Sequence, residues 1–192
     1  MPPRVLKSIA SDRAEMYRAT LQGSLDDPWR FMDPIRVGRV RTGEPEPQRY
    51  ITVARDGVPI ARIDAYAEDP GPFMDCVAWG RFILLGWDAI AHLIDPSTRK
   101  VLDVECAWYF GHFYPLDDRL LIASASELIC IDPRGDVLWS RGDLGLDGVI
   151  VTSTTDGWIR GEGEWDPPGG WRPFCVSLES GTLLESGDPQ RE

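Results

Sequence analysis

Short apolar stretches separated by turns dominate the chain from Tyr50 onward. Each stretch has the length of a β-strand, and the turns between them contain Asp, Pro or Gly, which supply the fixed or positive φ angles that hairpins need. Four segments share the order strand, turn, strand: 52–60, 92–102, 129–139 and 175–184. A further apolar strand precedes each of the last three, at 81–87, 119–125 and 148–152. This pattern predicts a body built of β-hairpins.

The hairpins recur at a nearly constant spacing. When Ile60, Leu102, Leu138 and Leu184 are taken as equivalent positions, the intervals are 42, 36 and 46 residues. A period of about 40 residues with about four strands per unit is typical of β-propeller blades. Such a unit cannot bury both of its faces alone, so consecutive units must stack on one another.

One of the hairpins also resembles a known repeat. The sequence Asp-Pro-Arg-Gly-Asp-Val-Leu-Trp at 132–139 resembles the blade hairpin of quinoprotein-type (pyrroloquinoline-quinone-like) β-propeller repeats, with weaker versions at 94–102, 178–184 and 53–60. The resemblance covers roughly residues 50–185. Members of that family have six to eight blades and bind quinones or serve as scaffolds. This chain has the length for three or four blades, and only Trp139 stands at the expected tryptophan position, so we expect no cofactor.

We therefore expect a mainly all-β fold, namely a small or partial β-propeller of three to four blade-like antiparallel units with a short N-terminal helix. Apolar residues at spacings of three and four between Leu6 and Leu21 predict that helix. We divide the chain into residues 1–49, a helix and loop that pack on the body, and residues 50–192, the blade-like β-repeat domain. The helix would cover an exposed edge strand, which otherwise invites association.

The chain is acidic. It has 31 Asp and Glu against 20 Lys and Arg, a formal net charge of −11, and residues 63–192 hold 23 of the acidic but only 9 of the basic residues. A negative surface repels phosphate backbones and attracts basic partners, so we expect no nucleic acid; the same charge could serve solubility alone. No apolar run has the length of a membrane span, and no secretory signal follows Lys7. We expect a cytoplasmic protein without membrane contact, and the scarcity of lysine fits a GC-rich bacterial genome.

The sequence contains no familiar catalytic or metal-binding motif. Its four cysteines are at least 24 residues apart without a CxxC pair, so we expect reduced core thiols and no metal site. His92 lies in an apolar strand and is expected to be a hydrogen-bonded core residue. His112 lies in an aromatic run, 108–114, which would either form a partner site or fill the space between blades.

The most unusual segment is Gly-Glu-Gly-Glu-Trp-Asp-Pro-Pro-Gly-Gly-Trp at 161–171. In an extended strand, Glu162, Glu164 and Asp166 would point to one face. Three functional interpretations compete: a calcium site, a paired-carboxylate glycosidase site, or an acidic and aromatic surface that binds a basic partner. A fourth interpretation is a structural hairpin whose tryptophans pack on the blade and whose acids face water. Of the functional interpretations, the surface for a basic partner agrees best with the net charge.

We predict a non-enzymatic acidic protein-binding module, of the kind represented by bacterial immunity proteins that neutralise a toxin or another basic partner. The alternatives are a carboxylate-dependent hydrolase directed at glycosides, which would use these acids with His112, and a self-associating scaffold that forms a homo-oligomer. No catalytic residue, metal or cofactor is assigned. The predicted partner-binding residues are Glu162, Glu164, Trp165, Asp166, Trp171, Trp158, His112 and Tyr114.

Overall fold

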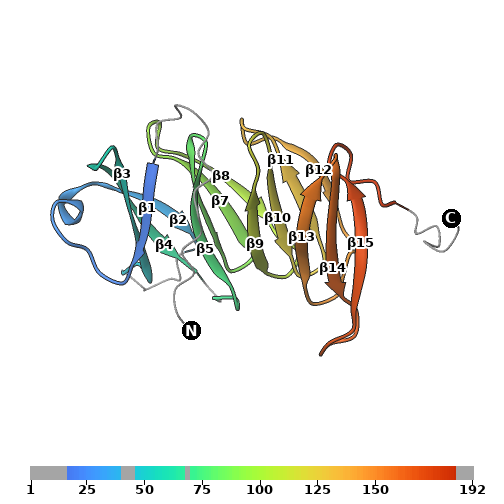
Figure 1. The fold of residues 1–192 in the computed structure, drawn as a ribbon. Coiled ribbons are helices and arrows are strands. Elements are labelled where there is room, and N and C mark those ends of the chain that lie inside the picture. The colour runs from blue at the N-terminus through green and yellow to red at the C-terminus, as the bar shows by residue number, and fades with distance from the viewer. Residues whose placement is uncertain (1–16, 40–45, 68–69, 185–192) are drawn as a thin grey trace, which may run out of the picture.

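The computed structural model describes residues 17–39, 46–67 and 70–184. Within these residues the chain forms fifteen strands and one short 3-10 helix, and the strands make four small sheets. The sheets follow one another in a row in sequence order, as the colours of Figure 1 show. The expectation of an all-β protein is confirmed. In the described part of the chain, no helix has the length and apolar character needed to cross a membrane.

The first sheet has the strand order β1-β3-β4-β2. Its strands are β1 (Tyr17–Gln22), β2 (Pro34–Gly38), β3 (Arg49–Arg55) and β4 (Val58–Tyr66). β2 is parallel to β4, whereas the other pairs are antiparallel. Because β2 is second in the sequence but lies at the far edge of the sheet, the chain crosses the sheet between β1 and β2. The 3-10 helix η1 (Trp29–Phe31) lies in this crossing.

The predicted N-terminal helix is wrong where the structure describes the chain. Residues 6–16 lie outside the described residues, but Tyr17 to Leu21 belong to β1, which pairs with β3. Tyr17 and Ala19 pack on the core while the residues that follow each of them are exposed, an alternation with a period of two. In so short a segment, spacings of three and four do not exclude a strand. The sheet therefore combines strands from both sides of residue 49.

The other three sheets are antiparallel meanders in which consecutive strands pair. The second sheet contains β5 (Met74–Trp79), β6 (Phe82–Trp87), β7 (Ile90–Asp95) and β8 (Lys100–Glu105). The third contains β9 (Phe110–Pro115), β10 (Leu120–Ser124), β11 (Leu128–Ile131) and β12 (Val137–Arg141). The fourth contains β13 (Val149–Thr155), β14 (Trp158–Glu164) and β15 (Trp171–Ser177). A bridge between Val176 and Leu183 continues the fourth sheet at the position where its neighbours have a fourth strand.

Most of the predicted strands are confirmed. The segments expected at 81–87, 119–125 and 148–152 correspond to β6, β10 and β13, and the hairpins at 92–102 and 129–139 correspond to β7–β8 and β11–β12. The hairpin at 52–60 also exists as β3–β4, but it forms the second and third strands of its sheet rather than the third and fourth.

Both faces of the two middle sheets are buried. On β6, Ile83 and Leu85 pack towards the first sheet while Phe82 and Leu84 pack towards the third. β10 divides its side chains in the same way between the second and fourth sheets. Because successive side chains of a strand point to opposite faces, a strand buried on both sides is apolar throughout. This explains the uninterrupted apolar runs in the sequence.

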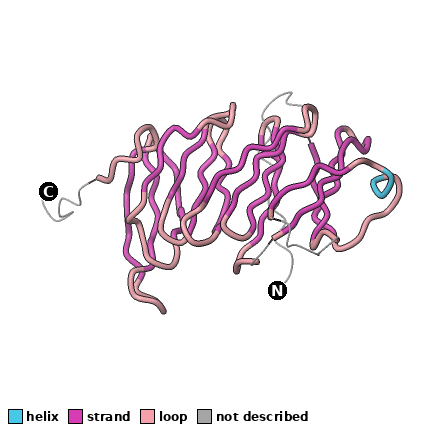
Figure 2. Tube along the Cα trace, turned by 180° about the vertical axis from the view of Figure 1, so that it is seen from behind, coloured by secondary structure: helices cyan, strands magenta, loops and turns pink. Residues whose placement is uncertain are grey.

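The row of sheets has two separate ends. Among the described residues, hydrophobic clusters join the first sheet to the second, the second to the third and the third to the fourth, and none joins the fourth to the first. Figures 1 and 2 show the first and fourth sheets at opposite ends of the row. The strands β1, β5, β9 and β13 contact one another in turn, so the first strand of every sheet lies along one edge of the row.

The end of the row at the first sheet is covered by η1 (Figure 2). The Trp29 indole donates a hydrogen bond of 3.5 Å to the carbonyl of Val53, and Arg62 donates one of 3.2 Å to the carbonyl of Arg30. Arg62 also forms a two-point ion pair with Asp64, with N–O distances of 2.7 and 2.8 Å. Asp64 is only 3% exposed, and a buried carboxylate requires such a partner. The Arg62–Asp64 pair therefore stabilises β4 and, through Arg62, fixes the η1 segment that covers the sheet.

The turns after the third strands of the last three sheets share one hydrogen-bonding pattern. Oδ1 of Asp95 accepts backbone N–H groups two and three residues later, at 2.9 and 3.2 Å. Oδ1 of Asp132 accepts two following backbone N–H groups at 2.8 and 3.0 Å. Ser177 uses its hydroxyl in the same way in the fourth sheet. The side-chain oxygen replaces a missing backbone partner in each turn.

Candidate functional site

A pocket of about 130 Å³ lies where the third and fourth sheets meet the loop before β5. It opens at the end of the strands where one sheet leads into the next, through residues 106–109 and 142–148; we call this end of the sheets the connection rim. Backbone hydrogen bonds stabilise the connection rim; for example, the Cys106 N–H donates to the carbonyl of Ala89 at 2.9 Å. The residues lining the pocket are Phe73, Tyr109, Gly111, His112, Ser124, Asp147, Gly148, Val149, Ile150, Glu164 and Trp171.

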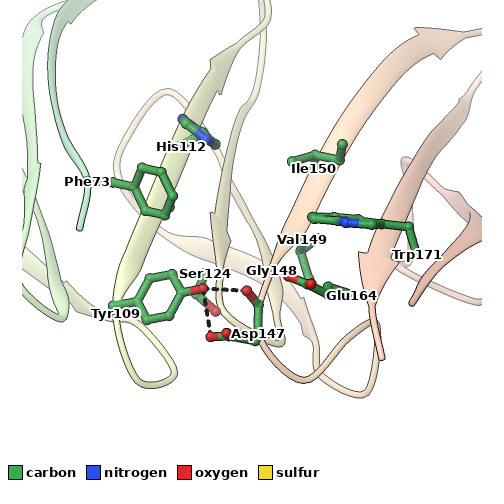
Figure 3. A pocket seen from close by; sticks show the side chains of 11 residues that line it. Phe73, Tyr109, His112, Ser124, Asp147, Gly148, Val149, Ile150, Glu164 and Trp171 are labelled. Carbon is green, nitrogen blue, oxygen red and sulfur yellow. Dashed lines mark hydrogen bonds between the residues drawn. The ribbon is translucent and has the colours of Figure 1, made fainter. Parts of the chain in front are cut away.

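Aromatic rings form one side of the pocket. The ring of Phe73 lies 5.1 Å from that of His112 and 5.9 Å from that of Tyr109, measured between centroids, and both pairs are tilted. Figure 3 shows these three rings together, opposite Ile150 and Trp171. The pocket is thus enclosed by ring surfaces that come from three separate segments of the chain.

Trp171 provides the opposite wall. It begins β15 directly opposite Glu164, the last residue of β14. Its ring reaches towards Gly148, where an added Cβ would lie 3.0 Å from the ring carbon Cη2. The absence of a side chain at Gly148 therefore leaves the space that the Trp171 ring occupies.

Two carboxylates lie at the pocket, and the backbone brings them together. The N–H groups of Leu146 and Asp147 both donate to the carbonyl of Glu164, at 2.6 and 3.3 Å, and the Glu164 N–H donates to Gly148 at 2.9 Å. The connection that contains Asp147 is therefore fastened to the end of β14. One carboxylate oxygen of Glu164 accepts the N–H of Gly169 at 2.7 Å.

Tyr109 is hydrogen-bonded to Asp147 at the edge of the pocket. Its hydroxyl donates to Asp147, lying 2.6 Å from the carbonyl oxygen and 3.2 Å from Oδ1 (Figure 3). Burial raises the pKa of Tyr109 to about 12, and the negative charges of Asp147 and Glu164 add to this effect. The hydroxyl consequently stays protonated and serves as a hydrogen-bond donor to Asp147.

Asp75 on β5 lies close to His112 but does not line the pocket. Burial raises the pKa of this carboxyl, while the backbone N–H groups of Cys76 and Phe113 and the charge of His112 act in the opposite direction. Asp75 therefore contributes to the environment of His112 from the neighbouring sheet.

Three of the predicted partner-binding residues meet in the pocket: His112, Glu164 and Trp171. They come from β9, β14 and β15. Tyr114, also predicted, has a structural contact instead, because its hydroxyl accepts the N–H of Val151 at 3.1 Å and so links the third and fourth sheets. Burial raises the pKa of Tyr114.

The other predicted residues lie outside the pocket. Glu162 is exposed on β14. Trp158 begins the same strand six positions before Glu164, a distance of about 20 Å along a strand. Trp165 carries the guanidinium of Arg172 over its ring, 5.7 Å from the centroid. Asp166 lies in the turn after β14, which ends at Glu164. The three carboxylates of this segment therefore do not line one strand face.

Sequence reasoning missed Phe73, Asp147 and Gly148. They lie in or next to connections between sheets, where no alternation of apolar and polar residues marks their role. Tyr109 belongs to the aromatic run that drew attention in the sequence, but it was not selected. A signal was available for Asp147, because the Asp- and Gly-rich stretch 142–148 has the composition of a surface loop.

The cysteines and the histidine outside this pocket lack the features of reactive or metal-binding groups. Burial raises the pKa of Cys76 and of Cys106 to about 12, far from the range of a reactive thiolate. His92 is 2% exposed with its Nδ1 2.7 Å from Asp103, which confirms the expected core histidine. In the part of the chain that the structure describes, no three His, Cys, Asp or Glu side chains are grouped to hold a metal ion.

No model of a known protein family matches this chain, and no curated protein matches it.

Proposed function

We propose that this protein is a non-enzymatic, acidic protein-binding module that holds a basic partner protein at its connection rim, in the manner of a bacterial immunity protein that neutralises a toxin. One observation carries the proposal: exposed tryptophans lie at this rim together with two carboxylates, Asp147 and Glu164, that form no ion pair with any described residue. In this proposal the module acts in the cytoplasm, and its thiols stay reduced.

Trp108 is the most exposed large hydrophobic residue of the described chain. Its side chain is 84% exposed, and it directly precedes Tyr109, whose ring lines the pocket. The backbone at Trp108 has a φ of +69°, a conformation that bulky residues rarely adopt. Trp171, 40% exposed, lies at the same rim. Exposed tryptophans at a pocket are the residue type most enriched among binding hot spots.

Two rim carboxylates, Asp147 and Glu164, differ from the arginine-paired carboxylates of this protein. Asp64 and Asp132 are paired with arginines at N–O distances of 2.7 and 2.8 Å. Among the described residues, neither Asp147 nor Glu164 forms an ion pair with a lysine, arginine or histidine. In a protein of net charge −11, these two groups are available to a positively charged partner.

We also propose that the four sheets are blades of an incomplete β-propeller related in design to quinoprotein-type repeats. Three observations support this interpretation: the meander order of the last three sheets, the Asp or Ser turn that recurs in them, and the first strands of all four sheets along one edge. In such an arrangement, the connections between blades and their neighbouring turns form a continuous surface for a partner.

The proposal is tested by isolating complexes of the full chain from cells of its source organism. We expect a stoichiometric partner with a pI above about 9, whose binding weakens as salt concentration rises. Trp108→Ala should weaken this binding at least tenfold. Phe31→Ala is the matched control, because Phe31 is also exposed (78%) but lies at the far end of the row.

A second pair of variants tests the charge contribution. Asp147→Asn with Glu164→Gln removes two negative charges at the connection rim and should weaken binding and its salt dependence. Asp117→Asn with Asp118→Asn removes two charges from the turn between β9 and β10, at the opposite ends of the strands, and should have little effect. A neutral or acidic stoichiometric partner, or equal losses in both double variants, would contradict the proposal.

A further inference from the structure

The rim pocket combines three properties that together select one kind of occupant. It is small, it has aromatic walls, and it is lined by two carboxylates, Asp147 and Glu164, beside the imidazole of His112. Pockets that enclose drug-sized molecules or cofactors are about 300–1,000 Å³, whereas this one is about 130 Å³. It therefore has room for the end of one side chain rather than for a whole cofactor or a sugar chain.

The lining favours a cation. Aromatic faces attract positive charge through their quadrupole, and the Trp171 ring lies across the pocket from the Phe73 and Tyr109 rings (Figure 3). Asp147 and Glu164 lie at one end of the same space, in the same view. The Tyr109 hydroxyl lies 2.6 Å from the carbonyl oxygen of Asp147 and 3.2 Å from its Oδ1. Because this hydroxyl is an uncharged donor, it brings no positive charge to the carboxylate.

The placement of the two carboxylates favours a guanidinium over an ammonium. Asp147 and Glu164 approach from different segments, the connection before β13 and the end of β14. A guanidinium has five donors in one plane and can serve two carboxylates while its faces stack on rings. An ammonium is a compact, strongly hydrated charge that does neither as well.

We propose that the rim pocket binds the guanidinium end of an arginine side chain, presented by the basic partner protein, between Trp171 and the Phe73–Tyr109 rings with Asp147 and Glu164 as acceptors. This inference deepens the proposed function and rests on it for the source of the arginine. The recognition chemistry can be tested without the partner.

The probe is N-acetyl-arginine N-methylamide, titrated into the full chain and followed by NMR of the tryptophan indole N–H signals. The Trp171 signal is assigned as the one lost in Trp171→Phe. We expect this signal to shift, with an affinity at least tenfold above that of N-acetyl-citrulline N-methylamide, which has nearly the same shape without the charge. Equal shifts with the citrulline probe would overturn the inference.

The variants locate the binding. Glu164→Gln and Asp147→Asn should each reduce the affinity for the arginine probe at least threefold, whereas Asp117→Asn with Asp118→Asn should leave it unchanged. Thermal unfolding confirms that each variant is folded before it is titrated. If the rim variants bind the arginine probe as tightly as the unmodified chain, the pocket assignment is wrong.

Two further probes test which cation binds and whether it belongs to a protein chain. Tighter binding of N-acetyl-lysine N-methylamide would overturn the guanidinium assignment. Tighter binding of free L-arginine than of the blocked probe would point to an amino acid ligand and overturn the protein source. A basic partner that binds without any effect of Trp171→Ala would refute the pocket inference alone, while arginine binding without any basic partner would refute the proposed function alone.

Discussion

At the scale of single residues, the aromatic run 108–114 shows how neighbouring side chains acquire different roles. Phe110 and Phe113 pack in the core between the second and third sheets, with ring centroids 4.6 Å apart, while Tyr109 and His112 line the pocket. Strict alternation along β9 would place Phe110 and His112 on one face. A register shift between β9 and β10, opposite Gly111, separates them. The sequence shows the aromatic run but does not show this irregularity.

Close contacts at glycines give the first prediction at this scale. A Cβ at Gly86 would lie 2.2 Å from the ring of Phe110, which is fully buried. We expect Gly86→Ala to lower the free energy of unfolding by about 1–3 kcal/mol, because the ring must move within a packed core. Gly142→Ala, with no atom near the added Cβ, should change it by less than about 0.5 kcal/mol. Urea denaturation measures both, and equal effects would contradict the packing described.

The turn at Asp95 gives a second prediction. Asp95→Ala removes a buried carboxylate that accepts two backbone N–H groups of the following turn and should cost about 1–2 kcal/mol at neutral pH. Asp95→Asn is the control, because it keeps the acceptor oxygen while removing the charge, and it should cost less.

The pH dependence of this effect follows from the pKa of Asp95. Burial opposes ionisation, but hydrogen bonds from Ser97 and Thr98 outweigh it and lower the pKa of the carboxyl. A carboxyl with a lower pKa in the folded state stabilises the fold above the unfolded value of about 3.9 and loses this contribution as pH falls through the folded value. The difference between the native chain and Asp95→Ala in urea denaturation should therefore shrink in acid. A difference that grows below pH 4 would contradict this assignment.

At the scale of elements, strands were easier to predict than their order. Buried runs such as Phe82–Leu85 and Asp-containing turns mark strands and hairpins locally, so the middle sheets could be predicted. The first sheet could not, because β2 joins it in parallel beside β4 after a crossing that covers the sheet. The site shows the same limit: His112, Glu164 and Trp171 could be selected by residue type, whereas Phe73 and Asp147 depend on how connections pack in space.

The cover of the first sheet gives a prediction at this scale. Arg62→Met leaves the carboxylate of Asp64 buried without its partner and removes a contact to the η1 segment. We expect a loss of about 3–5 kcal/mol in the free energy of unfolding. The double variant Arg62→Met with Asp64→Leu should recover much of this loss, since no uncompensated charge remains. A double variant as unstable as the single one in urea denaturation would show that the pair is not the cause.

At the scale of the whole molecule, stability should vary along the row. The second and third sheets have neighbours on both faces, and their strands β6, β7, β10 and β11 are also paired on both sides. The edge strand β12, in contrast, has exposed apolar residues, with Val137 at 53% and Leu138 at 45%.

Native-state hydrogen exchange tests this expectation. Amides of β6, β7, β10 and β11 should exchange slowest, at rates set by global unfolding, while those of β12 and of the fourth sheet should exchange faster through local opening. Slowest exchange in β13–β15 would mean that the fourth sheet is the most stable part of the protein, contrary to its place at the end of the row.

The η1 segment at one end of the row has a consequence for how such a protein could change in length. The η1 segment packs against β4 on the outer side of the first sheet, so a unit added there by gene duplication would have to displace it. Between the second and third sheets, by contrast, a duplicated segment of about 40 residues would meet apolar surfaces on both sides that already match its own. Longer and shorter versions of this architecture should therefore differ in their number of interior units while keeping the same starting sheet.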